Sequence, residues 1–278
     1  MLIPELQPLQ GQVHNNLYQT WTPPPPLSHW VHYFWQLDVP VGEFFYRSVP
    51  DNCVDLIISL NNLDEAILVS PFTEPIVYPI AGPTRYFGIR FRLLGQYSLF
   101  SETVEEWSPT DHQLPIRELL SPLFIERLQE SLSGSKGFHQ SCVRLARVML
   151  DHIDRPVIDP RVLKFVRYCY QSPRHFSLKE LAADQLGITD RQLRRLTQQY
   201  LGVSPKAFCQ VARFQHVLRA WQVEQDKTAW ADWYFDQSHF SREFSRLAGI
   251  SPNKFSAMSV LYNRTSSQSR IILPSDNV

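Results

Sequence analysis

Two stretches of the chain, TDRQLRRLTQQYLGVSPKAF at residues 189–208 and DQSHFSREFSRLAGISPNKF at residues 236–255, repeat one pattern at an offset of 47 residues. In each stretch a residue that can cap a helix comes first, and apolar residues follow at helical spacing. A glycine and a Ser-Pro pair then close the pattern. Each stretch therefore predicts a complete helix that ends at glycine, with proline beginning the next helix.

The ends of these two helices carry specific signals. Thr189 is a predicted N-cap, and Gln192 three residues later completes a capping box; Asp236 is the N-cap of the second copy. Gly202 and Gly249 are the predicted C-terminal ends. A shorter helix is predicted before each copy, at residues 178–186 and 228–233. Two short helices joined by a tight turn form a helix-turn-helix unit, so the sequence predicts two such units.

The polar face of each predicted helix carries side chains that can read bases. The inner face of the first helix is marked by the apolar residues Leu193, Leu196 and Tyr200, and the inner face of the second by Phe240 and Phe244. Arginine pairs with guanine and glutamine with adenine in the major groove. The candidate DNA-binding residues are therefore Arg191, Arg194, Arg195 and Gln198 in the first helix, and Gln237, Ser238, Ser241 and Arg242 in the second.

One long helix is predicted between the copies, over residues 205–224. About 20 helical residues span about 30 Å. Successive major-groove faces on one side of B-DNA lie about 34 Å apart. The spacing predicts that one monomer reads two consecutive turns, over about 17–20 base pairs with two non-identical halves.

Charge divides the chain into two parts. The whole sequence has 27 Lys and Arg and 27 Asp and Glu. Its net charge is therefore zero and gives no reason to expect that it binds a polyanion. Residues 157–262, however, carry 15 basic and 9 acidic side chains, whereas residues 1–156 carry 10 and 17. This asymmetry predicts two domains with different partners. Candidate phosphate contacts in the basic part are Lys179, Lys206, Arg219 and Lys254.

An enzyme is the alternative that DQSHFSREF raises. Asp236, Ser238 and His239 are the residue types of a hydrolase. On the first turn of one helix they point in different directions and cannot align as orienter, nucleophile and base. We therefore expect no catalytic residues and no enzymatic activity.

Short β-rich runs separated by Pro, Asn and Gly dominate residues 1–120, which predicts an antiparallel barrel or sandwich. Alternation within residues 29–38 places Val31, Tyr33, Trp35 and Leu37 on the face taken as inward. The predicted strands are residues 29–39, 43–49, 55–60, 66–70, 76–80 and 85–93.

A barrel with an aromatic interior can hold a small molecule, and the candidate effector-binding residues are Tyr33, Trp35 and Arg90. An aromatic core without a ligand is the equal alternative. His29 and His32 would lie on opposite faces of a strand, so we expect no metal site, and nothing indicates a cofactor.

Helical periodicity returns at residues 121–153, with a loop over 133–137. This hairpin can pack on the barrel or form a dimer interface. Cys53, Cys142, Cys169 and Cys209 form no CxxC pair and are expected to be reduced thiols. No segment approaches the about 18 apolar residues of a membrane span, which favours a cytoplasmic protein.

The stretch ADQLGITDRQLRRLTQQYLGVSPKAFCQVARFQHVLRAW together with DQSHFSREFSRLAGISPNKF resembles the AraC/XylS family of bacterial transcription regulators, over about residues 157–258. VPDNCVDLIISL at 49–60 and GIRFR at 88–92 look like the cupin-like sensory half of one branch of that family. The resemblance implies an α+β protein of two domains: an antiparallel cupin-like β-barrel with a helical hairpin, and an all-α, seven-helix DNA-binding domain.

The domains expected on this basis are a sensory barrel at 1–120, a hairpin and possible dimerisation element at 121–155, a DNA-binding domain at 157–262 and a flexible tail at 263–278. The resemblance also places the base contacts at the arginines, glutamine and serines named above, and makes Arg213 a brace between subdomains. It implies a transcription regulator controlled by an effector or a partner. The alternative is a constitutive DNA-binding dimer whose N-terminal domain only mediates protein contacts. Candidate partners are double-stranded DNA, a small-molecule effector, RNA polymerase and a second copy of the chain.

The chain departs from the family pattern at Trp233, where a glycine is usual in the second turn. Glycine there permits a left-handed turn or close packing, which tryptophan does not. We therefore expect an adjusted second unit.

Overall fold

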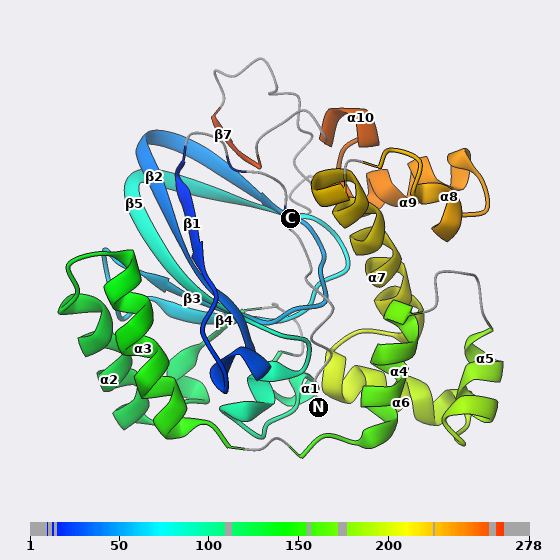
Figure 1. Cartoon of the computed structure of the whole chain (residues 1–278), viewed down its shortest axis with the longest axis horizontal. Helices are drawn as coiled ribbons and strands as arrows, with labels where there is room; N and C mark the ends of the chain where they lie inside the picture. The colour runs from blue at the N-terminus through cyan, green and yellow to red at the C-terminus, as the bar shows by residue number, and fades with distance from the viewer. Residues whose placement is uncertain are drawn as a thin grey trace, which may run out of the picture.

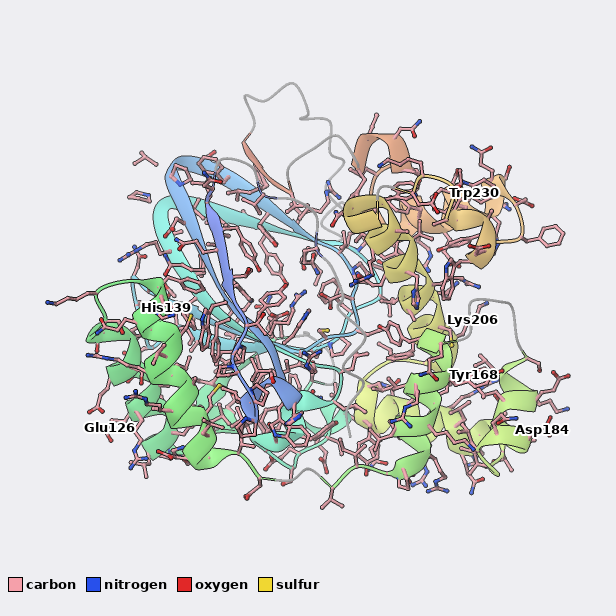
Figure 2. All side chains as sticks on the ribbon, viewed as in Figure 1. Glu126, His139, Tyr168, Asp184, Lys206 and Trp230 are labelled. Carbon is pink, nitrogen blue, oxygen red and sulfur yellow. The ribbon has the colours of Figure 1, made fainter. Side chains whose placement is uncertain are left out.

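The computed structural model describes residues 10, 13, 16–108, 113–154, 157–171, 177–224, 226–255 and 260–263. The N-terminal half is an antiparallel sheet with a helical hairpin and the C-terminal half is helical, so the predicted fold class is confirmed. Figure 1 shows the sheet at the left and centre and the helices of the C-terminal half along the right. Side chains fill the space between these layers (Figure 2).

Two long strands, β2 (Val31–Ser48) and β5 (Ile76–Phe91), pair along most of their length and form the middle of the sheet. The strand order is β1-β2-β5-β3-β4-β6, with β7 paired to β2. All these pairs are antiparallel. The shorter strands are β1 (Tyr18–Trp21), β3 (Asp55–Ser59), β4 (Ala66–Val69), β6 (Gln113–Pro115) and β7 (Leu261–Asn263).

The sequence predicted four strands where the structure has these two long ones. Residues 31–39 and 43–48 of the first two predicted strands belong to β2, and residues 76–80 and 85–91 of the other two belong to β5. The Pro and Gly residues interpreted as turns lie at an irregularity between Val39 and Gly42. A Cβ on Gly82 would lie 1.8 Å from the carbonyl oxygen of Pro40, so the strands approach too closely there for any other residue. The glycine marks a bend within the ladder.

Both faces of the first part of β2, from Val31 to Val39, are largely buried, whereas residues 40–43 are exposed. Phe34 packs in the main core together with Phe87, under the hairpin formed by α2 (Pro122–Ser133) and α3 (Phe138–His152). Trp35 and Leu37 lie in a separate cluster on the other face. The prediction was wrong for Val31, which packs with Phe34, because the ladder is irregular between Val31 and Tyr33 and the alternation shifts there.

In the region from residue 157 onward the described residues form seven α-helices, and a π-helical turn at Leu181–Gln185 continues the short helix that begins at Leu178. Two groups of them are joined by α7, which continues through a π-helical turn at Ala220–Glu224, as the predicted long helix requires. After the last helix the chain returns to the N-terminal sheet as β7, a strand that the sequence did not predict; beyond Asn263 the predicted tail lies outside the described residues. The helices are α4 (Pro160–Gln171), α5 (Leu178–Glu180), α6 (Asp190–Leu201), α7 (Pro205–Arg219), α8 (Trp230–Trp233), α9 (Gln237–Ala248) and α10 (Pro252–Phe255).

None of the helices in the described part of the chain is long and apolar enough to cross a membrane. The four cysteines are free thiols, three of them buried. Cys169 of α4 and Cys209 of α7 lie next to each other, with their sulfur atoms 3.1 Å apart.

Candidate nucleic-acid interface

Both repeated helices have the predicted ends. The Thr189 hydroxyl accepts from the backbone N–H of Gln192, whose side chain returns to Thr189, and α6 ends at Gly202 with φ +69°. The Asp236 carboxylate accepts from the backbone N–H of His239, and α9 ends at Gly249 with φ +71°. These caps satisfy N–H groups that the first helical turn leaves without partners. The two N-termini are therefore well-formed ends that can meet a ligand.

The N-terminal turns of α6 and α9 face solvent. Arg191, Arg194, Arg195 and Gln198 of α6 are exposed. In the described structure Arg194 pairs with Asp190 one turn earlier at 2.8 Å, both at the surface. Such a pair is weak in water and leaves the guanidinium available to another anion or base.

In α9 three of the four candidates are exposed, Gln237, Ser238 and Arg242, whereas Ser241 is half-buried. Arg242 donates from Nε to the Ser238 carbonyl oxygen at 3.3 Å. His239 is half-buried at the rim, as the sequence predicted. The polar face of α9 is thus less arginine-rich and slightly more recessed than that of α6.

The opposite, C-terminal ends of the same two helices contact the N-terminal half. The Tyr97 hydroxyl donates to the carbonyl oxygen of Tyr200 at 2.9 Å, near the end of α6. Arg47 donates from Nη1 to the carbonyl oxygen of Ala248 at 3.2 Å, at the end of α9. The carbonyl end of a helix is its electronegative pole, which suits a guanidinium. The N-terminal half therefore contacts each helix at the end remote from its capped N-terminal turn, and in α9 the exposed Arg246 of the last turn takes part by donating to the carbonyl oxygen of Thr73 at 3.4 Å.

A buried ion pair joins α9 to α7. Arg213 donates to Glu243 through Nε at 3.2 Å and through Nη2 at 3.0 and 3.1 Å, and Gln210 donates to the same carboxylate at 3.0 Å. The Arg213 guanidinium also lies 5.2 Å from the centre of the Tyr234 ring. This geometry matches the bracing role that the resemblance implied for Arg213.

Trp233 is accommodated without a left-handed turn. It ends α8, and the next residue, Tyr234, is extended with φ −127°. The Trp233 ring stacks on His216 of α7 at 3.9 Å between ring centres. Burial lowers the pKa of His216 to about 4, so the stacked imidazole is neutral at pH 7. Trp233 is thus held by an aromatic stack on α7, and the expected adjustment of the second unit relative to the family pattern stays a prediction.

The N-terminal sheet lines a partly open cavity of about 230 Å³. Trp35 and Arg90 line it, as predicted, but Tyr33 is not among the lining residues; its ring lies beside Arg90, 5.7 Å from the guanidinium carbon. The aromatic residues at the wall are Tyr18, Trp35, Tyr46, Phe72, Tyr78 and Tyr86.

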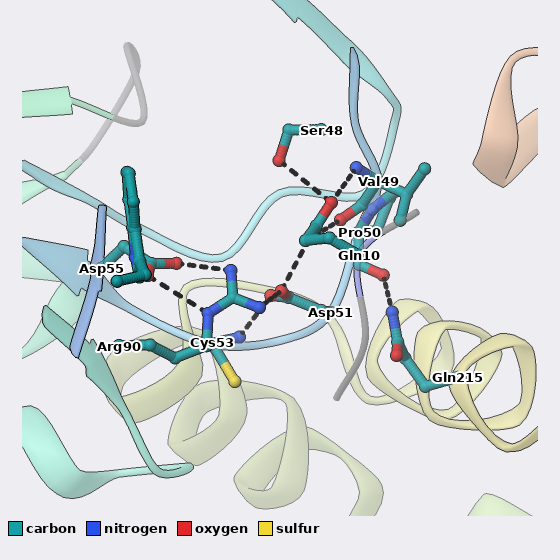
Figure 3. A network of polar contacts seen from close by, with 10 residues as sticks. Gln10, Ser48, Val49, Pro50, Asp51, Cys53, Asp55, Arg90 and Gln215 are labelled. Carbon is teal, nitrogen blue, oxygen red and sulfur yellow. Dashed lines mark hydrogen bonds and ion pairs between the residues drawn. The ribbon is translucent and has the colours of Figure 1, made fainter. Parts of the chain in front are cut away.

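The charged groups at this cavity form one network (Figure 3). Arg90 donates to Asp55 from Nε at 3.1 Å and from Nη2 at 2.7 Å, and its Nη1 lies 2.8 Å from Asp51. Trp35 donates its indole N–H to Asp55 at 3.2 Å, and Gln10 donates to Asp51 at 2.8 Å. Burial raises the pKa of Asp51 while Arg90 lowers it. Burial also opposes the charge of Arg90, but the two carboxylates hold its pKa well above the ordinary value.

This network continues to the helical half through the segment between β2 and β3. The carbonyl oxygen of Pro50 accepts from Gln215 of α7 at 2.8 Å, and Asn52 donates to the carbonyl oxygen of Phe208 at 3.1 Å. Asn52 is buried and has φ +62°, a left-handed conformation that asparagine tolerates. Asp51, between these two contacts, holds Arg90 of the cavity. Three consecutive residues therefore connect the cavity to α7.

The residue types of a hydrolase do not meet at the start of α9. The Asp236 carboxylate is the helix cap, and His239 Nε2 lies 3.9 Å from Glu243 on the inner side. Across the described ranges, no group of three His, Cys, Asp or Glu side chains is arranged to hold a metal ion.

Several residues of the cavity and its charged network escaped the sequence analysis. Asp51, Asp55 and the tyrosines of the wall come from different strands, so no local pattern joins them. One signal was present: VPDNCVDLIISL contains two carboxylates within an apolar run, and a buried carboxylate requires a partner.

Two parts of the chain match known families. Residues 182–258 match a family described as a helix-turn-helix domain, and residues 19–114 match one described as a domain of unknown function, DUF6597. No curated protein matches the chain at a significant level.

Solved structures of ToxT from Vibrio cholerae are similar to most of the chain at low identity. A lysine-to-alanine variant in its apo form is 11% identical, with 89% of this chain and 100% of that chain covered and a TM-score of 0.44. A second ToxT structure is 10% identical, with 88% and 99% covered and a TM-score of 0.45. The wild-type protein bound to an unsaturated fatty acid is 9% identical, with 83% and 91% covered and a TM-score of 0.41.

Proposed function

We propose, from the AraC-type helix-turn-helix domain that residues 182–258 form, that this protein is a DNA-binding transcription regulator in which α6 and α9 enter consecutive major grooves. The carrying observation is that each helix exposes its capped N-terminal turn while its C-terminal end contacts the N-terminal half. We take residues 157–262 as the DNA-binding domain, residues 1–120 as the sensory domain and residues 121–155 as the hairpin. We assign the protein no catalytic activity and place it in the cytoplasm with its DNA.

The exposed side chains divide into two roles. Arg191, Arg194, Arg195 and Gln198 of α6 would read bases, with Gln237, Ser238, Ser241 and Arg242 of α9 reading the second half-site. Phosphate contacts would come from the basic side chains around them. Lys179, Lys206 and Lys254 are exposed and Arg219 is half-buried, which suits contacts that position the domain.

Genomic footprinting of the purified protein tests this function. We expect protection of about 17–20 base pairs with two unlike halves. Arg195→Ala should weaken binding to the true site by about 1–3 kcal/mol and relax the preference at one base pair. Arg147→Ala, an exposed arginine of α3, is the matched control and should leave the footprint unchanged. Equal weakening on all DNA sequences would contradict base reading by Arg195, and absence of any protected site would contradict the function.

We further propose that a small effector in the cavity controls DNA binding. The segment of residues 47–53 supports this role: Asp51 holds Arg90 at the cavity, while Pro50 and Asn52 contact α7 and Arg47 contacts α9. A ligand that binds one arrangement of this segment better shifts the spacing or orientation of the two recognition helices.

A coupling variant tests this control. Gln215→Leu removes the hydrogen bond to Pro50 without touching the cavity or the exposed arginines. We expect it to bind DNA but to lose most of the effector's influence on that binding. If the effector changes the footprint of the variant as strongly as that of the wild type, this contact does not carry the signal.

The hairpin supports the alternative, a DNA-binding dimer whose N-terminal domain mediates protein contacts. Leu123 of α2 and Leu150 of α3 are 53% and 42% exposed, although the rest of the hairpin's apolar face packs on the sheet. Leu123→Glu with Leu150→Glu should convert a dimer to a monomer in sedimentation velocity. A contact with RNA polymerase stays a prediction from the resemblance.

A further inference from the structure

The cavity in the N-terminal sheet has a chemical character that selects among ligands. Six aromatic side chains and several aliphatic ones form its wall, and its charged lining residues are Asp55 and Arg90. Its volume of about 230 Å³ is below the range of about 300–1,000 Å³ typical of drug-sized ligands. A cavity of about 150 Å³ accepts benzene in another protein. This one therefore has room for a ring with a short charged or polar chain.

The guanidinium of Arg90 is already neutralised. Nε and Nη2 donate hydrogen bonds to Asp55, and Nη1 forms an ion pair with Asp51 at 2.8 Å without hydrogen-bond geometry. A ligand carboxylate would have to displace one of these buried pairs, and doing so leaves a buried charge without its partner.

Both carboxylates of the network accept hydrogen bonds and donate none. Asp51 accepts from Gln10 and from the backbone N–H of Cys53, and Asp55 accepts from Trp35 and Arg90. A protonated acid would need an acceptor of its own. Two carboxylates and one guanidinium therefore leave the network with a formal charge of −1.

The negative charge of the network favours a positively charged ligand, and the aromatic wall does so as well. Ring faces are electronegative, and cages of Tyr and Trp with a nearby carboxylate recognise ammonium groups in many proteins. Asp55 lies at this cavity, and among the described residues its Oδ2 atom accepts a hydrogen bond from Arg90 only, which leaves that oxygen able to accept one more. We infer that the cavity binds a small organic cation, an amine or ammonium on an apolar body. This inference rests on the proposed control by an effector and names its chemical class.

Three probes with the same phenyl body test the inference: 2-phenylethylammonium, 2-phenylethanol and 3-phenylpropanoate. Calorimetric titration of the full chain should give the ammonium at least about tenfold tighter binding than the alcohol, and the carboxylate should bind most weakly. Alcohol or carboxylate binding as tight as that of the ammonium overturns the inference. Absence of ammonium binding at millimolar concentration overturns it as well.

Two variants place the binding in the cavity. Asp55→Asn should reduce the preference for the ammonium over the alcohol to less than about threefold. Because Asp55 also supports Arg90, Tyr78→Leu provides a second variant that removes one half-buried ring and leaves the network intact. Tyr168→Leu, a half-buried ring of α4, is the matched control and should bind the ammonium like the wild type. Unchanged ammonium selectivity in both cavity variants overturns the assignment.

The footprint of the ligand-free protein separates this inference from the proposed function. Selective ammonium binding by a protein that protects no DNA would leave the ligand class intact and contradict the regulator. A normal footprint without ammonium selectivity would leave the regulator function intact and contradict the ligand class.

Discussion

The ion pair between Arg213 and Glu243 allows a quantitative test of how the second recognition helix is held. Its side chains are 17% and 5% exposed, and three donor–acceptor distances of 3.0–3.2 Å join them. Arg213→Met removes the positive partner and leaves the Glu243 carboxylate buried with Gln210 and the more distant His239. Removing one partner of a buried pair costs about 3–5 kcal/mol, because the remaining charge is uncompensated.

The double variant Arg213→Met, Glu243→Leu distinguishes the cost of an unpaired charge from the value of the pair. Replacing both charges by apolar side chains is often close to neutral, so we expect the double variant to recover most of the lost stability. Urea unfolding, followed by tryptophan fluorescence, measures the free energy of unfolding of the single and the double variant. Arg161→Met, which breaks a pair with Asp159 in which the arginine side chain is 41% exposed, is the control and should cost less than about 1 kcal/mol.

The same variants should change how DNA is protected. Because Arg213 and Glu243 join α9 to α7, Arg213→Met should lose protection of the second half-site before that of the first. The reasoning is refuted if Arg213→Met costs no more than Arg161→Met, or if the double variant is as unstable as the single one.

Two further predictions concern a C-terminal glycine and a histidine. Gly249→Ala should destabilise the protein about 1 kcal/mol more than Gly187→Ala, as measured by urea unfolding. Both glycines have φ near +70°, so the backbone cost of alanine is similar at the two positions. A Cβ on Gly249 would lie 2.4 Å from Arg47 Nη1, whereas a Cβ on Gly187 would enter open space. Equal costs would mean that Arg47 adapts freely. The pKa of His216 in the folded protein is about 4, below the ordinary 6.5, because burial disfavours the charged imidazole. The neutral His216 therefore contributes fully to the free energy of unfolding above about pH 6.5, and up to about 3 kcal/mol of that free energy is lost as the pH falls toward 4. His216→Phe keeps the stack on Trp233 but cannot be protonated. Between pH 7 and pH 4 the variant should lose about 3 kcal/mol less unfolding free energy than the wild type. Equal losses in the two proteins would show that His216 is not the titrating group.

The helical half could be predicted from the sequence because its signals are local. Thr189 and Gln192 form the capping box within four residues, and Gly202 adopts the left-handed conformation at the end of α6. The period of the buried leucines also determined which arginines face solvent. Such features depend on neighbours within one or two turns, so they persist whatever the rest of the chain does.

The cavity and the contacts between the halves were decided by the tertiary structure alone. Arg47 and Ala248 are 201 residues apart, and Asp55 and Arg90 meet because β3 and β5 pair in one register. A shift of that register by one residue would leave Asp55 and Arg90 on opposite faces of the sheet. Register, the bend at Gly82 and the closure of long loops depend on many distant contacts together, so a local pattern contains no record of them.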